Sequence, residues 1–192
     1  MANTAEKYGL RPVRKLDGSP FINAQNRYRI AANYGTPIYQ GDLVKPVTGG
    51  GIERAVANTS DLVVGVFNGV FYTDPTTQKP TWKNYYPGTV NASDIVATIV
   101  DDPDVVYSVD SDGAFAVADI FKNFAITTAT GNTLSGISEV QMDYSVSGLT
   151  VSGTVLQAID ISQDTNSSTA GSVNVDVLVR INNHFYAQGT GI

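Results

Sequence analysis

The stretch DDPDVVY (101–107) carries the side chains of this sequence that are best suited to chemistry. Three carboxylates, Asp101, Asp102 and Asp104, stand close together around Pro103. Paired carboxylates can serve as acid and base in glycoside hydrolysis, and clustered carboxylate oxygens can bind Ca²⁺. Apolar, β-type runs lie on both sides, so the stretch is also typical of a hard corner between two strands. Which alternative holds decides whether the chain resembles an enzyme.

The partners that catalysis would need are missing from the sequence. There is one histidine, His184, near the end of the chain, and there is no cysteine. No nucleophile elbow, phosphate-binding loop or dinucleotide fingerprint occurs. The sequence DSDG (110–113) matches the first half of a calcium loop, but no Glu follows at the required spacing. We therefore expect no catalytic residue, no cofactor and no metal site.

The acidic stretch then has two structural interpretations. Proline cannot donate to a strand ladder, so Pro103 forces a bend, a bulge or an edge. Aspartates can accept hydrogen bonds from turn N–H groups, and adjacent like charges discourage stray strand pairing. Alternatively, the cluster of Asp101, Asp102 and Asp104 receives Arg or Lys from a neighbouring subunit.

Composition indicates a β-rich body. The chain has 192 residues, of which 42% are hydrophobic and only 16% are charged, with 18 glycines. This length suits one compact domain with a real core, and the composition suits many short strands and turns. No apolar run reaches the length of a membrane span, and the N-terminus has no apolar secretory segment. The sequence therefore predicts a protein that is made and used in a cytosol.

Strand signals begin near residue 37. The clearest is the alternation at 173–181, where the residues from Val173 to Ile181 at every second position are apolar. The segment 114–128 is ambiguous, with a helical turn or a strand as alternatives. We expect an all-β fold, either a β-sandwich of jelly-roll type or a small barrel. The other expected strands lie at 37–47, 61–73, 93–100, 105–113 and 155–162.

We expect residues 1–36 to form an extended basic arm that is joined to a β-rich body at 37–192. Residues 1–30 hold six basic and two acidic side chains, a net charge of +4, whereas the remainder holds six basic and sixteen acidic ones, a net charge of −10. An acidic body repels phosphate, so nucleic acid is not an expected partner. The arm has no sustained period but carries several apolar side chains. It therefore either packs along its own body or docks on a partner.

The loop at 74–90 gathers aromatic side chains. It contains the single tryptophan, Trp82, next to Tyr85 and Tyr86. These rings either cap the core or form a contact surface, because exposed aromatic rings favour interfaces. In the second case they join the acidic stretch as candidate contacts between subunits.

Three blocks of sequence together resemble a known family. They are GLRPVRKLDGSPF (9–21), VVGVFNGVFYTD (63–74) with the following KPTWKNYYPG (79–88), and IVDDPDVVYSVDSDG (99–113). The sequence is similar in these blocks to the head decoration, or cement, proteins of tailed bacteriophages. The first block departs from the family at position 10, where Leu replaces the expected aromatic ring.

The resemblance implies a structural virion protein without an active site. Such proteins bind the outer face of the major capsid shell, bridge capsomers and stabilise the head, and they are usually β-rich dimers or trimers. The expected location is the virion surface after assembly in the host cytoplasm, and the expected partners are the major capsid protein and further copies of the chain, not nucleic acid or membrane. The expected capsid-binding residues of the arm are Tyr8, Leu10, Arg11, Arg14, Lys15, Phe21, Arg27 and Arg29.

Two other functions are compatible with the residues. A tail- or fibre-associated β-domain could recognise host glycans by stacking sugars on Trp82, Tyr85 and Tyr86. A hydrolase could be built on the carboxylates at the acidic stretch. Bonding of Asp101 and Asp102 to backbone in a turn, far from any cleft, is the observation that would argue against the hydrolase.

Overall fold

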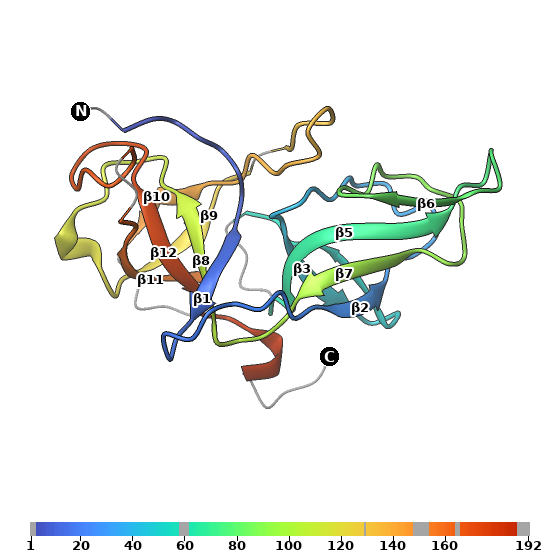
Figure 1. Cartoon of the computed structure of the whole chain (residues 1–192), viewed down its shortest axis with the longest axis horizontal. Helices are drawn as coiled ribbons and strands as arrows, with labels where there is room; N and C mark the ends of the chain where they lie inside the picture. The colour runs from blue at the N-terminus through green and yellow to red at the C-terminus, as the bar shows by residue number, and fades with distance from the viewer. Residues whose placement is uncertain (1–2, 58–61, 129, 148–153, 164–165, 188–192) are drawn as a thin grey trace.

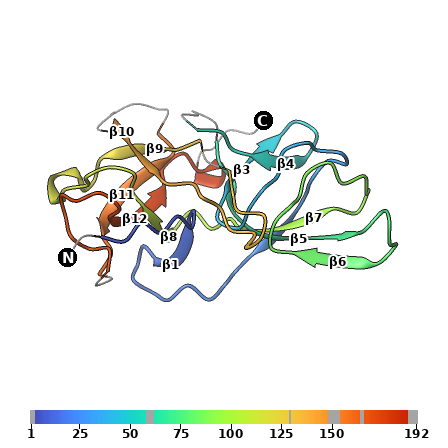
Figure 2. The ribbon, with the colours of Figure 1, turned by 90° about the horizontal axis from the view of Figure 1, so that it is seen from above.

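The computed structural model of the chain describes residues 3–57, 62–128, 130–147, 154–163 and 166–187. Within these residues the strands form two antiparallel sheets at opposite ends of the longest axis (Figure 1, Figure 2). The prediction of an all-β fold is confirmed. Neither sheet closes into a barrel. Of the two predicted architectures, the described residues therefore agree with the sandwich-like one.

Sheet A has the strand order β1-β8-β12-β11-β9-β10. Strands β1 and β12, the first and the last strand of the described residues, are therefore the two neighbours of β8. Two short 3-10 helices, η1 (Val117–Asp119) and η2 (Phe185–Ala187), lie outside the sheets, and the described residues contain no helix long and apolar enough to cross a membrane. The strands of sheet A are β1 (Arg11–Lys15), β8 (Val105–Asp110), β9 (Asn123–Ile126), β10 (Met142–Ser147), β11 (Leu156–Ile161) and β12 (Asp176–Ile181).

Sheet B has the order β2-β7-β5-β3-β4, and β6 pairs with the C-terminal half of β5. The sheet is strongly curled. A Cβ added to Gly51 in β4 would lie 2.9 Å from the carbonyl oxygen of Arg29 in β2, so these two edge strands approach each other. The strands are β2 (Asn26–Arg29), β3 (Leu43–Val47), β4 (Gly51–Arg54), β5 (Gly65–Thr73), β6 (Pro80–Lys83) and β7 (Val96–Val100).

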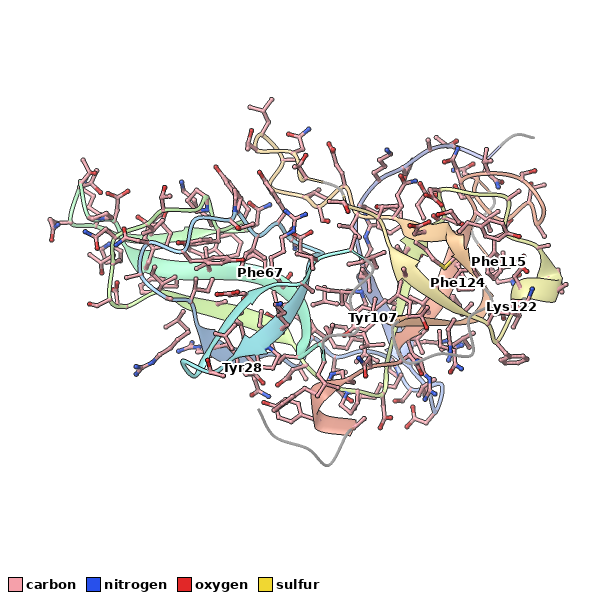
Figure 3. All side chains as sticks on the ribbon, turned by 180° about the vertical axis from the view of Figure 1, so that it is seen from behind. Tyr28, Phe67, Tyr107, Phe115, Lys122 and Phe124 are labelled. Atoms are coloured by element: carbon pink, nitrogen blue, oxygen red, sulfur yellow. The ribbon has the colours of Figure 1, made fainter. Side chains whose placement is uncertain are left out.

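Each sheet has its own hydrophobic core. In β12 the side chains of Val177, Val179 and Ile181 are buried, as the alternation at 173–181 predicts. The core of sheet A contains Phe115 and Phe124, whose ring centroids are 5.6 Å apart, and the core of sheet B contains Phe67. Figure 3 shows Phe115 and Phe124 together in the part formed by sheet A and Phe67 in the part formed by sheet B.

The N-terminal segment is part of the body and not an extended arm. Its strand β1 pairs with β8 in sheet A, and its strand β2 pairs with β7 in sheet B. Tyr8 and Leu10 are buried, and the hydroxyl groups of Tyr8 and Ser108 are hydrogen-bonded at 2.8 Å. Of the two alternatives for the segment, the structure shows packing along its own body. The predicted division into 1–36 and 37–192 therefore does not follow the sheets.

The acidic stretch is the corner at which the chain passes from one sheet to the other. Strand β7 of sheet B ends at Val100, and β8 of sheet A begins at Val105. Between them the backbone N–H of Asp104 donates to Oδ1 of Asp102 at 2.9 Å, and the N–H of Val105 donates to the carbonyl oxygen of Asp102. An aspartate-stabilised turn at Pro103 thus links the two sheets.

Glycine is required where β5 begins beside the end of β7. A Cβ at Gly65 would lie 2.1 Å from the carbonyl oxygen of Val100, which is backbone and cannot move without disturbing the ladder. We expect Gly65→Ala to lower the free energy of unfolding by about 3 kcal/mol or more. Urea denaturation followed by circular dichroism measures this loss.

The matched control for this substitution is Gly35→Ala. No atom lies within 4 Å of a Cβ added at Gly35, so this change should leave the unfolding midpoint nearly unaltered. Equal midpoints for Gly65→Ala and Gly35→Ala would show that the backbone contact at Gly65 does not constrain the fold.

Candidate functional site

A group of hydrogen-bonded polar side chains lies at the junction between the sheets, around Asp101. This carboxylate is 9% exposed and accepts two hydrogen bonds from Nδ2 of Asn26, at 3.1 and 2.9 Å. It also accepts a hydrogen bond from the hydroxyl group of Tyr28. Asn26 and Tyr28 both belong to β2, so the corner residue Asp101 fastens the N-terminal segment to the end of β7.

Asp102 and Lys15 form an ion pair beside this group. The Nζ of Lys15 lies 2.7 Å from Oδ2 of Asp102, and the N–H of Leu16 donates to the carbonyl oxygen of Asp104. The hydrogen bond from Lys15 holds the pKa of Asp102 below its usual range, and Asp102 raises the pKa of Lys15. The basic partner of the acidic stretch is therefore a residue of the same chain.

Of the two interpretations of the acidic stretch, the structure shows the corner between strands, and the cation bound to Asp102 is Lys15 of the same chain. Asp101 and Asp102 are engaged within the chain, because β1 and β2 bring Lys15, Asn26 and Tyr28 to the corner. Asp104 is exposed. Its carboxylate is the member of the cluster that faces solvent.

The end of β12 brings a third element to the junction. His184 is buried, and its Nδ1 accepts a hydrogen bond from the backbone N–H of Tyr186 at 3.2 Å. Its Nε2 has no hydrogen-bond partner among the described residues. Burial lowers the pKa of His184, although Asp101 and the other carboxylates at the corner oppose that shift. The hydroxyl groups of Tyr186 and Tyr28 are 2.8 Å apart, so a chain of contacts connects η2 to Asp101.

The carboxylates of the acidic stretch have structural contacts within the chain. A shallow cleft of about 810 Å³ lies beside it, lined by Asp101, Asp102, Tyr28 and Tyr186 among others. Both oxygens of Asp101 accept hydrogen bonds, and Asp102 is bonded to Lys15 and to backbone. The carboxylates are thus close to a cleft, but their contacts hold the two sheets together. Of the two features that would argue against a hydrolase, bonding to backbone in the turn holds for Asp102, whereas distance from a cleft does not hold.

The DSDG sequence does not assemble a calcium loop. Oδ2 of Asp110 accepts a hydrogen bond from Gln141 at 2.9 Å, whereas Oδ1 of Asp112 accepts one from the N–H of Tyr144 at 2.8 Å. The described part of the chain contains no group of three or more His, Asp or Glu residues placed to hold a metal ion. The two carboxylates therefore serve separate contacts.

Sequence reasoning missed a second buried carboxylate at the junction, Asp42. It is 1% exposed and accepts hydrogen bonds from the hydroxyl group of Ser138 at 2.6 Å and from the N–H of Tyr39 at 2.8 Å. Nε of Arg54 lies 3.5 Å from its Oδ2. Because Ser138 follows β9 of sheet A and Asp42 precedes β3 of sheet B, this group also connects the sheets. Its signal in the sequence is a charge inside the apolar run PIYQGDLV.

The structure separates the three rings of the 74–90 loop. Trp82 is 62% exposed on β6, whereas Tyr86 is fully buried in the core of sheet B. Tyr85 stacks on Tyr39 with ring centroids 5.7 Å apart and an interplanar angle of 9°. Tyr86 is therefore not a contact between subunits, and the predicted three-ring surface is not formed. Trp82 remains as the exposed member.

The expected capsid-binding residues of the N-terminal segment also separate. Tyr8 and Leu10 are buried and Phe21 packs partly against the core of sheet A, so the expectation that they anchor a partner is wrong for Tyr8 and Leu10. The reason is that Leu10 belongs to the hydrophobic core of sheet A, and the hydroxyl group of Tyr8 is hydrogen-bonded to Ser108 of β8. The remaining members are basic: Arg11 lies 4.5 Å from the ring centroid of Tyr8, Arg14 donates to the carbonyl oxygen of Lys15, and Arg27 and Arg29 are exposed.

Comparison of the chain with protein-family models, with curated proteins and with solved structures found no match.

Proposed function

We propose that the chain is a structural virion protein that decorates the capsid. It binds the outer surface of the major capsid shell, bridges neighbouring capsomers and stabilises the head. It does so as a homo-oligomer on the virion surface after assembly in the host cytoplasm. The proposal rests on the three sequence blocks that resemble the cement proteins of tailed bacteriophages.

The observation that favours a structural role is the use made of the acidic corner. The side chains with the greatest chemical potential, Asp101 and Asp102, hold β1 and β2 against the β7–β8 turn. Most of the remaining basic residues of the N-terminal segment stay accessible, in particular Arg11, Arg27 and Arg29. Exposed cations on a rigid β-rich body suit attachment to an acidic protein surface.

We expect the double substitution Arg11→Glu and Arg14→Glu to weaken binding to undecorated heads by about tenfold or more, since it reverses two charges that steer docking. Co-sedimentation of the protein with purified heads at two salt concentrations measures the effect. Lys79→Glu, an exposed charge reversal in the β5–β6 turn, is the control and should bind like the wild type.

Two results would contradict the proposal. The first is a wild-type protein that fails to sediment with heads at any salt concentration. The second is a purified virion in which the chain is absent or far less abundant than the shell protein. Deletion of residues 1–30 is not a suitable variant, because it removes the edge strand β1 from sheet A and the edge strand β2 from sheet B.

A second candidate function is recognition of host glycans by a tail- or fibre-associated domain. The exposure of Trp82 favours it, since a free indole face can stack on a sugar ring. The burial of Tyr86 and the stacking of Tyr85 on Tyr39 reduce the available platform to this one ring from the loop. A glycan array with wild-type protein and Trp82→Ala separates the two functions, because a decoration protein should bind no glycan.

A further inference from the structure

The turn that leads into β9 carries an aromatic side chain at a position where turn geometry favours glycine. Residues 119–122 form a type II β-turn: the N–H of Lys122 donates to the carbonyl oxygen of Asp119 at 3.1 Å, and Ile120 has φ −59° and ψ 140°. The third residue of the turn, Phe121, has φ 70°. This position of a type II turn requires a positive φ, so glycine or asparagine normally fills it.

Phe121 is an unusual residue for this conformation. Among the described residues, six residues other than glycine have a positive φ; three of them are asparagine, and Phe121 is the only aromatic one. A bulky side chain in the left-handed region strains the backbone. The ring gains little in return within the chain, because it is 77% exposed. A strained position that stabilises nothing in its own fold is typical of a functional site.

The ladder between β9 and β11 fixes the backbone at this position. The N–H of Phe121 donates to the carbonyl oxygen of Ala158 in β11, and the N–H of Ala158 donates to the carbonyl oxygen of Lys122, each at 3.0 Å. Phe121 and Lys122 thus oppose the single residue Ala158, which is a β-bulge whose first residue is left-handed. The position of the ring is therefore set by the sheet.

The buried carboxylate of Asp119 holds the other side of the turn. It is 6% exposed and accepts hydrogen bonds from the N–H of Ala116 at 2.9 Å and from the hydroxyl group of Tyr144 at 3.0 Å. Its Oδ1 lies 2.7 Å from Nζ of Lys122. The turn is thus fixed before any partner binds, so little conformational freedom is lost on contact.

Val117 of η1 joins Phe121 at the surface. Val117 is 65% exposed, whereas Ile120, between the two, packs partly against the core of sheet A. We call Val117 and Phe121 the apolar knob. Figure 3 shows Lys122, the residue that follows Phe121, at the end of sheet A that is remote from sheet B. The apolar knob therefore lies far from the junction between the sheets.

We propose that the apolar knob inserts into an apolar pocket on the outer face of the major shell protein, an inference that rests on the proposed function. In an interface, charges mainly set orientation and association rate, whereas a few buried side chains carry most of the affinity. Tyr8 and Leu10, which were expected in this second role, are buried within the chain. The apolar knob supplies the anchor that they do not.

The place of the apolar knob in the fold suits a molecule that bridges capsomers. Arg27 and Arg29 belong to β2 of sheet B, whereas the apolar knob lies beyond β9 of sheet A. The two sheets lie at opposite ends of the longest axis (Figure 1). The basic side chains and the apolar knob can therefore contact different capsomers at the same time.

The surroundings of the apolar knob favour a protein pocket over other partners. The cation beside it, Lys122, is paired with Asp119, so it gives little attraction to the phosphates of lipid head groups or nucleic acid. One ring and one valine also bury less apolar surface than the single acyl chain that gives only marginal membrane binding. Aromatic side chains, in contrast, are enriched at the centres of protein interfaces.

Co-sedimentation with undecorated heads at two salt concentrations tests the inference. Phe121→Ala removes the ring, and we expect it to bind heads about tenfold or more weakly than the wild type. The loss should be similar at both salt concentrations, because salt screens charges and not apolar contacts, whereas the effect of Arg11→Glu with Arg14→Glu should shrink at high salt. Leu134→Ala removes a side chain that is 98% exposed on another loop, and this control should bind like the wild type.

Phe121→Gly separates the role of the ring from the integrity of the fold. Glycine adopts a positive φ without strain, so the Tm of this variant should lie about 2–4 °C above that of the wild type. It should nevertheless bind heads as weakly as Phe121→Ala, which retains the strain and should unfold near the wild-type temperature. Differential scanning calorimetry measures both values. Weaker binding by a more stable protein has no explanation in misfolding.

The outcomes distinguish this inference from the proposed function. Wild-type affinity in Phe121→Ala would overturn the inference and leave the proposed function standing, whereas a wild-type protein that binds no heads would overturn both. A lower Tm for Phe121→Gly would mean that contacts within the chain hold the ring, and it would also contradict the inference. Binding to phosphatidylcholine vesicles or to glycans that is lost in Phe121→Ala, without a change in head binding, would assign the apolar knob to that other partner.

Discussion

The substitution Asp110→Asn should increase the stability of the protein at pH 8. Asp110 is 1% exposed at the end of β8, and burial raises its pKa to about 7. Its Oδ1 has no hydrogen-bond partner among the described residues, and Asp176 of β12 is its partner in the ladder. A buried carboxylate opposite another carboxylate is costly when ionised. An amide of the same shape removes the charge.

The sign of the pH dependence follows from the direction of the shift. The folded pKa lies above the unfolded value of 3.8, so the folded state holds its proton more firmly. The ionised group therefore costs nothing below pH 4, costs progressively more as the pH rises toward 7, and has its full effect above that. The difference between the folded and the unfolded pKa of Asp110 corresponds to an upper bound of about 4 kcal/mol, and we expect a gain of about 2 kcal/mol for Asp110→Asn at pH 8.

Urea denaturation of wild type and Asp110→Asn at pH 4 and pH 8 measures the effect. The two proteins should have similar stability at pH 4 and differ at pH 8. The control is Asp104→Asn, which neutralises an exposed carboxylate and should change stability little at either pH. A loss of stability in Asp110→Asn at pH 8 would mean that the charged form of Asp110 is stabilised by contacts that outweigh its burial.

The second large effect is expected at the corner between the sheets. Asp101→Ala removes the acceptor of two hydrogen bonds from the exposed Asn26 and of one from the half-buried Tyr28. Hydrogen bonds to charged acceptors are stronger than neutral ones, so the loss of three of them is costly. We expect the free energy of unfolding to fall by about 3 kcal/mol.

Neighbouring substitutions separate this effect from the general loss of charge. Asp102→Ala breaks a partly exposed ion pair with Lys15, so it should be clearly less destabilising than Asp101→Ala. Asp101→Asn keeps an acceptor for Tyr28 and should fall between the two. Chemical denaturation of the three variants gives the order directly. Equal losses for Asp101→Ala and Asp102→Ala would mean that the contacts with β2 do not fasten the N-terminal segment.

Much of the β-rich body could be predicted because its strands carry their own pattern. The alternation at 173–181 corresponds to β12, although Val173 is exposed and lies before the strand begins at Asp176. The apolar run at 61–73 contains β5, while residue 61 lies outside the described residues. The ambiguous segment 114–128 contains both alternatives in succession, the 3-10 turn η1 and then β9. A strand with one buried face needs apolar side chains on that face, and its sequence therefore shows a regular pattern.

The N-terminal strands could not be predicted in the same way. Strands β1 and β2 are four or five residues long and lie at sheet edges, so each is held by one neighbouring ladder and by side chains at the corner. No period develops over such a length, and Pro12 argues against a strand unless it lies at an edge. Their conformation is set by β8 and β7, which are far away in the sequence.

In the candidate site, too, some residues could be predicted from the sequence and others could not. Asp101 and Asp102 were identifiable from their spacing, and the corner at Pro103 is where the sequence places it. Their partners Lys15, Asn26 and Tyr28 were not, because they belong to the N-terminal segment, far away along the chain, and no local signal links them. Buried Asp42 was missed for a related reason: its acceptor role depends on Ser138, which arrives from the other sheet.

The strand order of sheet A has a consequence for the synthesis of the protein. Sheet B is drawn from a continuous stretch between Asn26 and Val100, whereas β12 lies between β8 and β11 and emerges last. At about 5–20 residues per second, the stretch from Val100 to Ile181 takes roughly 4–16 s to translate. During this time sheet B can fold on the ribosome, whereas β8 still lacks its neighbour β12. Until β12 arrives, the edge of β8 opposite β1 lacks its partner strand and is open to other nascent chains.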